Sequence, residues 1–153
     1  MRNRAVRLIQ RRGGFTLVEL IVVMVILVLL AGTVTVVVVN RIEDGKRTKA
    51  RVDVAGLEQA VDLYYLDAGN YPTSQQGLEA LLNEPTSPPI PAKWNGPYIK
   101  KSLPVEPWGS DYIYEYPGTN NPDSFDIFSM GKDQAVGGTD NDMDIGNWHE
   151  TNQ

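Results

Sequence analysis

The chain contains no cysteine and a single histidine, His149, among its 153 residues. The absence of cysteine excludes a disulfide framework, thiolate catalysis and a zinc site built on cysteine sulfur. One histidine near the C-terminus offers no partner set for nucleophilic catalysis, and no glycine-rich phosphate-binding loop is present. The sequence therefore predicts a protein that is not an enzyme.

Charge is almost absent between Phe15 and Val39, where Glu19 is the single charged residue in 25. As a helix, this run would be roughly 37 Å long, which exceeds the ~30 Å hydrocarbon core of a bilayer. Valine and isoleucine weaken helices in water, but in lipid the backbone has no hydrogen-bond partner outside the helix. The run predicts a transmembrane helix over residues 15–40.

Basic residues are concentrated before this run. Five arginines and no acid precede Gly13, and they are Arg2, Arg4, Arg7, Arg11 and Arg12. A positive flank stays cytoplasmic, so the domain at residues 41–153 is expected outside the cytoplasm. Without these arginines, nine basic residues face 19 acidic ones. That balance argues against nucleic-acid binding by the folded domain. The polar stretch at residues 40–44 is also unlike the cleavage site of a secretory signal.

The residues between the arginines and the apolar run form a recognisable motif. Gly14-Phe15-Thr16-Leu17-Val18-Glu19 resembles the cleavage motif of type IV pilin-like prepilins. The resemblance implies that a prepilin peptidase removes residues 1–14 after Gly14 and that Phe15 becomes an N-methylated terminus. It also implies that Glu19 pairs with the Phe15 amine of a neighbouring subunit during assembly, which would neutralise a carboxylate in an apolar helix.

Residues 41–68 show a helical period. Val54, Leu57, Val61 and Tyr64 fall on one face, and Gly69, Asn70 and Pro72 predict the helix end. No proline occurs before Pro72, so the transmembrane helix can continue into this amphipathic one. The basic residues of the early turns are expected mostly on the exposed side: Arg41, Lys46, Arg47, Lys49 and Arg51.

The rest of the chain predicts short elements. Thr73 and Gln76 form a capping-box pattern before a short helix with Leu78, Leu81 and Leu82. The proline-rich stretch 85–97 is interpreted as a packed loop because Trp94 and Tyr98 accompany it. Alternating patterns at residues 111–116 and 124–130 predict an antiparallel hairpin in which one face of each strand is buried. The predicted class is α+β, with a long N-terminal helix packed on a small antiparallel sheet.

Three further segments narrow the resemblance: residues 66–81, Gly96-Pro97-Tyr98-Ile99-Lys100-Lys101 and Glu106-Pro107-Trp108-Gly109. They resemble the major, G-type pseudopilins of the type II secretion system over nearly the whole chain. The resemblance implies an inner-membrane protein with its C-terminal domain in the periplasm. It further implies polymerisation into a helical fibre of identical subunits that drives export of folded proteins. Minor pseudopilins and an inner-membrane assembly platform are the other expected partners.

An acidic, glycine-containing loop follows the second predicted strand. Four aspartates lie between Asp133 and Asp144, and oxygen-rich loops of this kind suit Ca²⁺, although the spacing is not that of an EF-hand. From composition alone, a solvated acidic turn is the simpler interpretation. The family resemblance implies a calcium site in this loop, with ligands from Met130 (through its carbonyl), Asp133, Asp140 and Asp142. It does not fix the roles of Asn141 and Asp144.

Two alternatives remain open from the sequence. A type IV pilin of a surface fibre would share the N-terminal motif, but such pilins usually carry a C-terminal cysteine pair that this chain lacks. A membrane-anchored periplasmic binding module would use its Tyr and Trp residues as a ligand site and would need no leader cleavage. The mass of the mature chain separates this second alternative from a pilin-like subunit.

Overall fold

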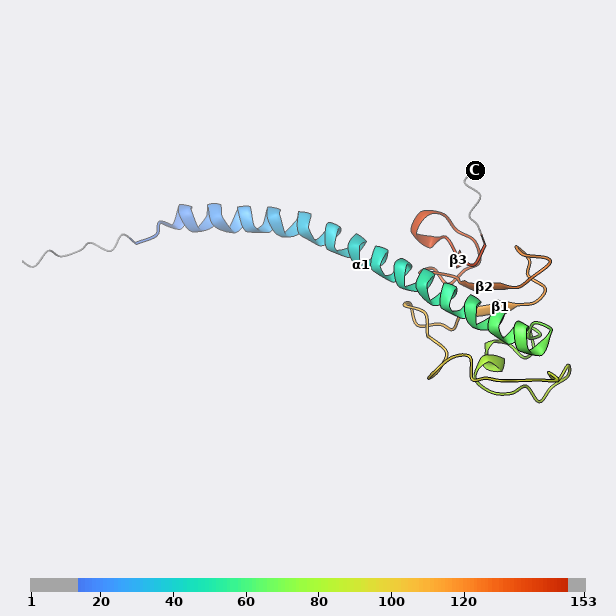
Figure 1. Ribbon diagram of the computed structural model, residues 1–153. Helices are drawn as coiled ribbons and strands as arrows, with labels where there is room; N and C mark the ends of the chain where they lie inside the picture. Colours follow the sequence, from blue (N-terminus) through green and yellow to red (C-terminus); the bar gives the residue numbers. More distant parts are fainter. Residues whose placement is uncertain (1–13, 149–153) are drawn as a thin grey trace, which may run out of the picture. The chain divides into compact units, whose positions relative to one another are not determined.

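The computed structural model describes residues 14–148, except for the side chains of residues 32–37. The element order is α1 (Leu17–Ala68), the 3₁₀ helix η1 (Leu78–Leu81), β1 (Ile113–Glu115), β2 (Asp126–Ser129), the 3₁₀ helix η2 (Asp140–Asp142) and β3 (Ile145–Gly146), as Figure 1 shows. The chain divides into two compact units, residues 1–40 and 41–153, and α1 contributes residues to both.

Helix α1 is continuous over 52 residues, which confirms the expected continuation of the apolar helix into the amphipathic one. It ends where the sequence predicts. Gly69 has φ of 79°, a left-handed conformation that glycine adopts without strain, and its N–H donates to the Tyr65 carbonyl at 2.8 Å. Pro72, three residues later, cannot continue the helix.

The predicted core face of α1 is confirmed. Val54, Leu57, Val61 and Tyr64 are almost fully buried in the second unit. The prediction for Arg47 is wrong, because this side chain is only 7% exposed. Arg47 lies seven positions before Val54, two helical turns away on the same stripe, so it faces the domain and not solvent.

A three-stranded antiparallel sheet in the order β1-β2-β3 packs with this face of α1 (Figure 1). Tyr114 pairs with Ile127 in the β1–β2 register, so the predicted hairpin is confirmed, although both strands are shorter than expected. Strand β3 was not predicted. It pairs with β2 through Ser129 and Ile145 and makes β2 the central strand.

The prediction that β2 buries only one face is wrong, because all four of its residues are buried. On the face expected to be exposed, Asp126 has no solvent exposure and accepts hydrogen bonds from the Asn120 and Asn121 backbone N–H groups at 2.7 and 3.0 Å. Phe128, on the same face, contacts the Trp148 ring. A loop and the chain after β3 therefore cover a face that alternation assigns to solvent.

The segment between α1 and the sheet is packed as expected. The Thr73 N–H donates to Gln76 Oε1, and the Gln76 N–H donates to Thr73 Oγ1, which is the reciprocal pattern of a capping box. The helix that follows, η1, is a single 3₁₀ turn. Trp94 donates its indole N–H to the Ala80 carbonyl and packs with Tyr98 against the core.

Candidate functional site

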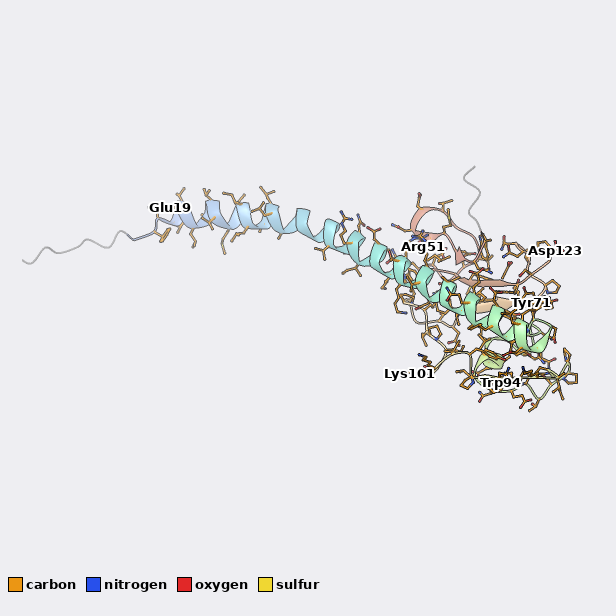
Figure 2. All side chains as sticks on the ribbon, viewed as in Figure 1. Glu19, Arg51, Tyr71, Trp94, Lys101 and Asp123 are labelled. Atoms are coloured by element: carbon orange, nitrogen blue, oxygen red, sulfur yellow. The ribbon has the colours of Figure 1, made fainter. Side chains whose placement is uncertain are left out.

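The first turn of α1 contains the acid that the sequence singles out. Glu19 lies at the start of the helix (Figure 2). The Thr16 N–H donates to Glu19 Oε2 at 3.2 Å, and the Glu19 N–H donates to Thr16 Oγ1 at 3.2 Å. These two bonds form a capping box that satisfies backbone donors at the helix end. Glu19 therefore caps its own helix, while its predicted pairing with a neighbour's amine stays a prediction.

The first unit displays exposed apolar side chains. From Phe15 to Leu30, the large apolar side chains are 48–86% exposed. Among residues with described side chains, no helix has an apolar stretch long enough to cross a membrane. The predicted transmembrane segment, residues 15–40, includes residues 32–37, whose side chains lie outside that description.

The acidic loop closes through its last aspartate. The Asp144 N–H donates to the Gly137 carbonyl at 3.1 Å, and the Gly137 N–H donates back to Asp144 Oδ2 at 2.8 Å. Gly138 is needed for this path, because its φ is 87° and a Cβ there would lie 2.2 Å from the Asp142 carbonyl oxygen. The loop thus returns on itself over residues 137–144.

One oxygen of this closing residue has no hydrogen-bond partner among the described residues. Asp144 is 8% exposed, and its Oδ1 atom is buried without a donor. Burial raises the pKa of the Asp144 carboxyl, and the negative charge of Asp133 raises it further, while the Gly137 N–H opposes both effects. A buried carboxylate oxygen of this kind is costly unless a donor or cation reaches it.

A buried arginine holds the same loop against α1. Arg47 Nη1 donates to the carbonyls of Asn141 and Met143, both at 3.0 Å. The ion pairs in the described part of the chain are Arg41–Asp44 and Lys49–Asp53, so Arg47 forms no ion pair there. The guanidinium therefore binds the loop backbone and leaves the neighbouring carboxylates unneutralised.

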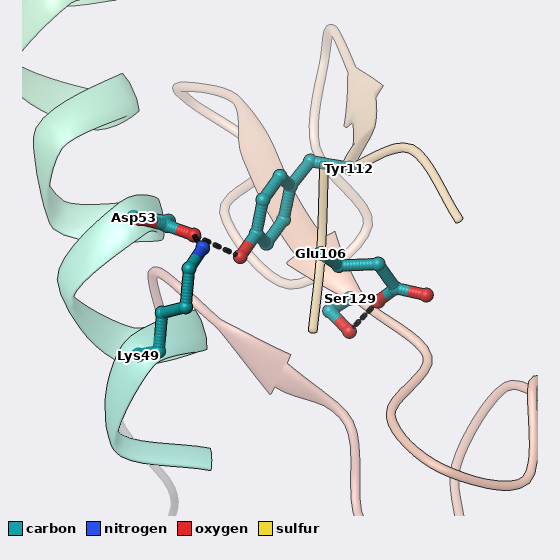
Figure 3. Close-up of polar contacts among 5 residues, drawn as sticks. All are labelled: Lys49, Asp53, Glu106, Tyr112 and Ser129. Atoms are coloured by element: carbon teal, nitrogen blue, oxygen red, sulfur yellow. Dashed lines mark hydrogen bonds and ion pairs between the residues drawn. The ribbon is translucent and has the colours of Figure 1, made fainter. Parts of the chain in front are cut away.

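The beginning of the loop is fixed by a second buried charged residue. Glu106 is 3% exposed and accepts a hydrogen bond from the Ser129 hydroxyl at the end of β2, which Figure 3 shows. Its other oxygen accepts from Gln134 Nε2 at 2.8 Å, and the same nitrogen donates to the Gly131 carbonyl at 2.7 Å. Through Gln134, Glu106 connects the 106–110 turn to residues 131–134.

Asp133 and Asp144 offer the carboxylate oxygens that a hard cation prefers, and the negative charge of Asp133 raises the pKa of the Asp144 carboxyl. Asp140 and Asp142 lie exposed in η2, and Asp140 adopts a left-handed φ of 53°. Within residues 14–148, no group of three or more acidic or histidine side chains is arranged to hold a metal. A full Ca²⁺ shell would therefore need backbone carbonyls or water, as calcium sites commonly use. The predicted ligand set stays a prediction.

Sequence reasoning missed Arg47, Glu106 and Gln134 as residues that shape the loop. A signal existed only for Arg47, because positions 47, 50, 54 and 57 continue the apolar spacing of α1. Glu106 and Gln134 lie 28 positions apart, and no local pattern relates them. Asp144 was noted in the sequence, but its burial was not foreseen.

Comparison with known proteins agrees with this architecture. Residues 37–148 match the family model described as Type II secretion system (T2SS), protein G, and residues 9–35 match the Prokaryotic N-terminal methylation motif. A relative described as Type II secretion system core protein G from Pseudomonas aeruginosa is 49% identical over 91% of this chain and 96% of its own length. Proteins with the same description from Vibrio cholerae and Escherichia coli are 44% and 41% identical over 92% and 93% of this chain, and 94% of each relative is covered.

A solved structure shows the same fold. The crystal structure of the major pseudopilin from the type 2 secretion system of enterohaemorrhagic Escherichia coli matches with a TM-score of 0.62 and 39% sequence identity, over 71% of this chain and 87% of that one. A long helix that begins within an N-methylation motif and packs on a three-stranded antiparallel sheet is the architecture of a pilin-like subunit, and the match to a major pseudopilin identifies the class as pseudopilin. The chain belongs to the type II secretion system protein G family, whose members are structural subunits and not enzymes.

Proposed function

We propose that this major pseudopilin is cleaved after Gly14, N-methylated at Phe15 and held in the bacterial inner membrane by residues 15–40 until it polymerises in the periplasm. The observation that carries the proposal is the exposed apolar surface from Phe15 to Leu30, next to the N-methylation motif. Such a surface needs lipid or other protein around it.

Polymerisation must replace the lipid contacts of this helix. Transfer of a Leu, Ile, Phe or Val residue from a bilayer centre costs about 0.3–0.6 kcal/mol, so extraction is unfavourable unless the helices repack against one another. A charged Glu19 side chain at the bilayer centre would instead destabilise the inserted helix by about 2.5–3.5 kcal/mol, and by less near an interface. Pairing of Glu19 with the Phe15 amine of a neighbour would remove both this penalty and the isolated positive charge.

The fibre would be a helical homo-oligomer that acts with minor pseudopilins, an inner-membrane assembly platform and a prepilin peptidase. Its extension in the periplasm would drive folded proteins across the outer membrane. The acidic second unit, outside the cytoplasm, gives no support to a role in nucleic-acid binding.

Calcium is the cofactor that we propose for the acidic loop. Support comes from the buried, unpartnered Oδ1 atom of Asp144 and from the negative charge of Asp133, which raises the pKa of the same carboxyl. A bound Ca²⁺ would supply the positive charge that neutralises these oxygens. The residues that we expect to hold it are Asp133 and Asp144, with Met130 (through its carbonyl), Asp140 and Asp142 as further predicted ligands.

The test compares the proteins in the culture medium of the native host with and without this gene. Folded proteins that leave the medium and accumulate in the periplasm when the gene is deleted support the proposal. Unchanged secretion together with lost surface fibres, motility or DNA uptake would instead identify a type IV pilin. Intact mass of the membrane-extracted chain tests processing separately, because the proposal requires a chain that begins at methylated Phe15.

A further inference from the structure

The feature with the least obvious role is the buried guanidinium of Arg47. Arg41 and Arg51 on the same helix are exposed, and among the charged residues of α1 Arg47 alone is buried. Burying an arginine requires compensation, and here it comes from two backbone carbonyls, those of Asn141 and Met143. These carbonyls flank Asp142, and Met143 directly precedes Asp144, which closes the acidic loop.

This arrangement is unusual for an arginine that binds a loop containing four aspartates. In the part of the chain that the structure describes, the guanidinium makes no ion pair with any of them. A counter-charge would neutralise the carboxylates directly and compete with a metal ion. A group that binds only the backbone instead fixes where the carboxylates lie and leaves their oxygens available.

We propose that Arg47 is a positioning residue for the cation-binding loop and that it couples occupancy of the loop to helix α1. The inference rests on the calcium site proposed above. Arg47 binds Asn141 and Met143, which lie 94 and 96 positions after it in the sequence. It lies on α1, seven residues after the last residue of the first unit. A cation that orders residues 137–144 would strengthen the Arg47 contacts, and by reciprocity those contacts would strengthen cation binding.

Two roles for Arg47 predict opposite effects of removing its charge. If Arg47 acts as a competing positive charge, its loss raises calcium affinity, because one repulsive charge disappears. If Arg47 positions the loop, its loss lowers affinity, typically 10–100-fold for a residue that orients metal ligands. The sign of the change therefore separates the two roles.

The experiment uses the full processed chain in detergent micelles. Calcium affinity is measured by isothermal titration calorimetry, and hydrogen exchange of α1 residues 44–51 is followed with and without calcium. We expect Arg47→Met to lower affinity at least tenfold and to abolish the calcium-dependent protection of residues 44–51. Arg51→Met removes the same charge from an exposed position one helical turn after Arg47 (Figure 2). This variant is expected to change neither the affinity nor the protection.

Arg47→Lys is the control for misfolding of the Arg47→Met variant, because lysine keeps the charge and a hydrogen-bond donor but lacks the planar guanidinium. Partial recovery of affinity and protection in this variant supports the proposal. Wild-type affinity and protection in Arg47→Met, or an increase in affinity, would overturn the proposed role of Arg47 and leave the calcium site standing. If the wild-type chain binds no calcium at all, the calcium proposal fails and the coupling fails with it, while the secretion role remains testable in the host.

Discussion

Tyr112 donates its phenolic proton to Asp53 Oδ2 at 2.8 Å, which ties the segment before β1 to helix α1. Lys49 reaches the same carboxylate from one turn earlier on the helix, as Figure 3 shows. The hydroxyl of Tyr64, by contrast, is buried without a partner among the described residues. The domain thus contains one tyrosine whose hydroxyl joins α1 to the segment before β1 and another whose hydroxyl is unsatisfied.

These two tyrosines give a matched pair of variants. Tyr112→Phe removes a hydrogen bond to a charged acceptor and is expected to lower the free energy of unfolding by about 1.5–3 kcal/mol. Tyr64→Phe removes a buried, unsatisfied hydroxyl and is expected to leave stability unchanged or to raise it. Urea denaturation of both variants measures the difference, and an equal loss in both would contradict this account of the Tyr112–Asp53 bond.

The buried phenols make the domain sensitive to alkali. Burial raises the pKa of Tyr112 and Tyr114 far above the ordinary value of 10.0, and the negative charge of Asp53 raises that of Tyr112 further. Raised pKa values of these two phenols stabilise the folded state fully below pH 10.0. This contribution is lost as the pH rises above 10.0, because the unfolded chain then releases these protons more readily than the folded one. We expect the phenolate absorbance of Tyr112 and Tyr114 to appear together with unfolding above pH 10.0; full ionisation of all tyrosines in the folded protein would contradict this.

Asp126 is expected to be the most sensitive acid of the sheet. Its carboxylate has no exposure and accepts hydrogen bonds from the backbone and side-chain amides of Asn120 and Asn121. Asp126→Ala leaves these donors unpaired and should cost about 3 kcal/mol or more. Asp123→Ala, at an exposed acid in the same loop, should stay within about 0.5 kcal/mol. Thermal melts of both proteins test the difference.

Asp144 should affect stability in opposite directions with and without calcium. In the presence of EDTA, Asp144→Asn removes a buried charge with an unpartnered oxygen and should raise the melting temperature. In calcium at 100 times its dissociation constant, the wild type gains about 2.7 kcal/mol from binding, and the variant should lose most of this gain. Melts of both proteins under both conditions provide the test, with Asp133→Ala expected to abolish the EDTA effect. An unchanged wild-type melt on chelation would exclude a stabilising cation.

Glu19 should be required for assembly but not for insertion. Glu19→Leu removes the charge and makes the helix more apolar, so the protein should still fractionate with membranes. The neighbouring Phe15 amine would then lack its partner, and we expect loss of fibres in a strain that overproduces the protein. Thr16→Val removes the capping hydroxyl while leaving Glu19 charged, and it should reduce assembly less. Normal fibres from Glu19→Leu would disprove the pairing.

Local signals were enough to predict α1 and its end. The stripe of Val54, Leu57, Val61 and Tyr64 repeats with the helical period, and Gly69 supplies the left-handed residue that closes the helix. The leader motif around Gly14 and Phe15 is equally local, and it is matched by the N-methylation motif over residues 9–35. Each of these features depends on neighbours within a few turns, which the sequence displays directly.

The tertiary structure alone decided the burial of Asp126 and Asp144 and supplied the partners of Arg47, whose position on the apolar stripe of α1 was visible in the sequence. Arg47 binds carbonyls 94 and 96 positions away, and β3 joins β2 only after the acidic loop has returned to the sheet. A charged residue normally predicts an exposed position, because burying it without partners is unfavourable. Backbone groups supply partners for all three: carbonyls 94 and 96 positions away for Arg47, and N–H groups five to seven positions away for Asp126 and one oxygen of Asp144. Such irregular contacts leave no periodic trace in the sequence. The sequence alone therefore determines the long helix and its processing motif, whereas the geometry of the acidic loop depends on the folded chain.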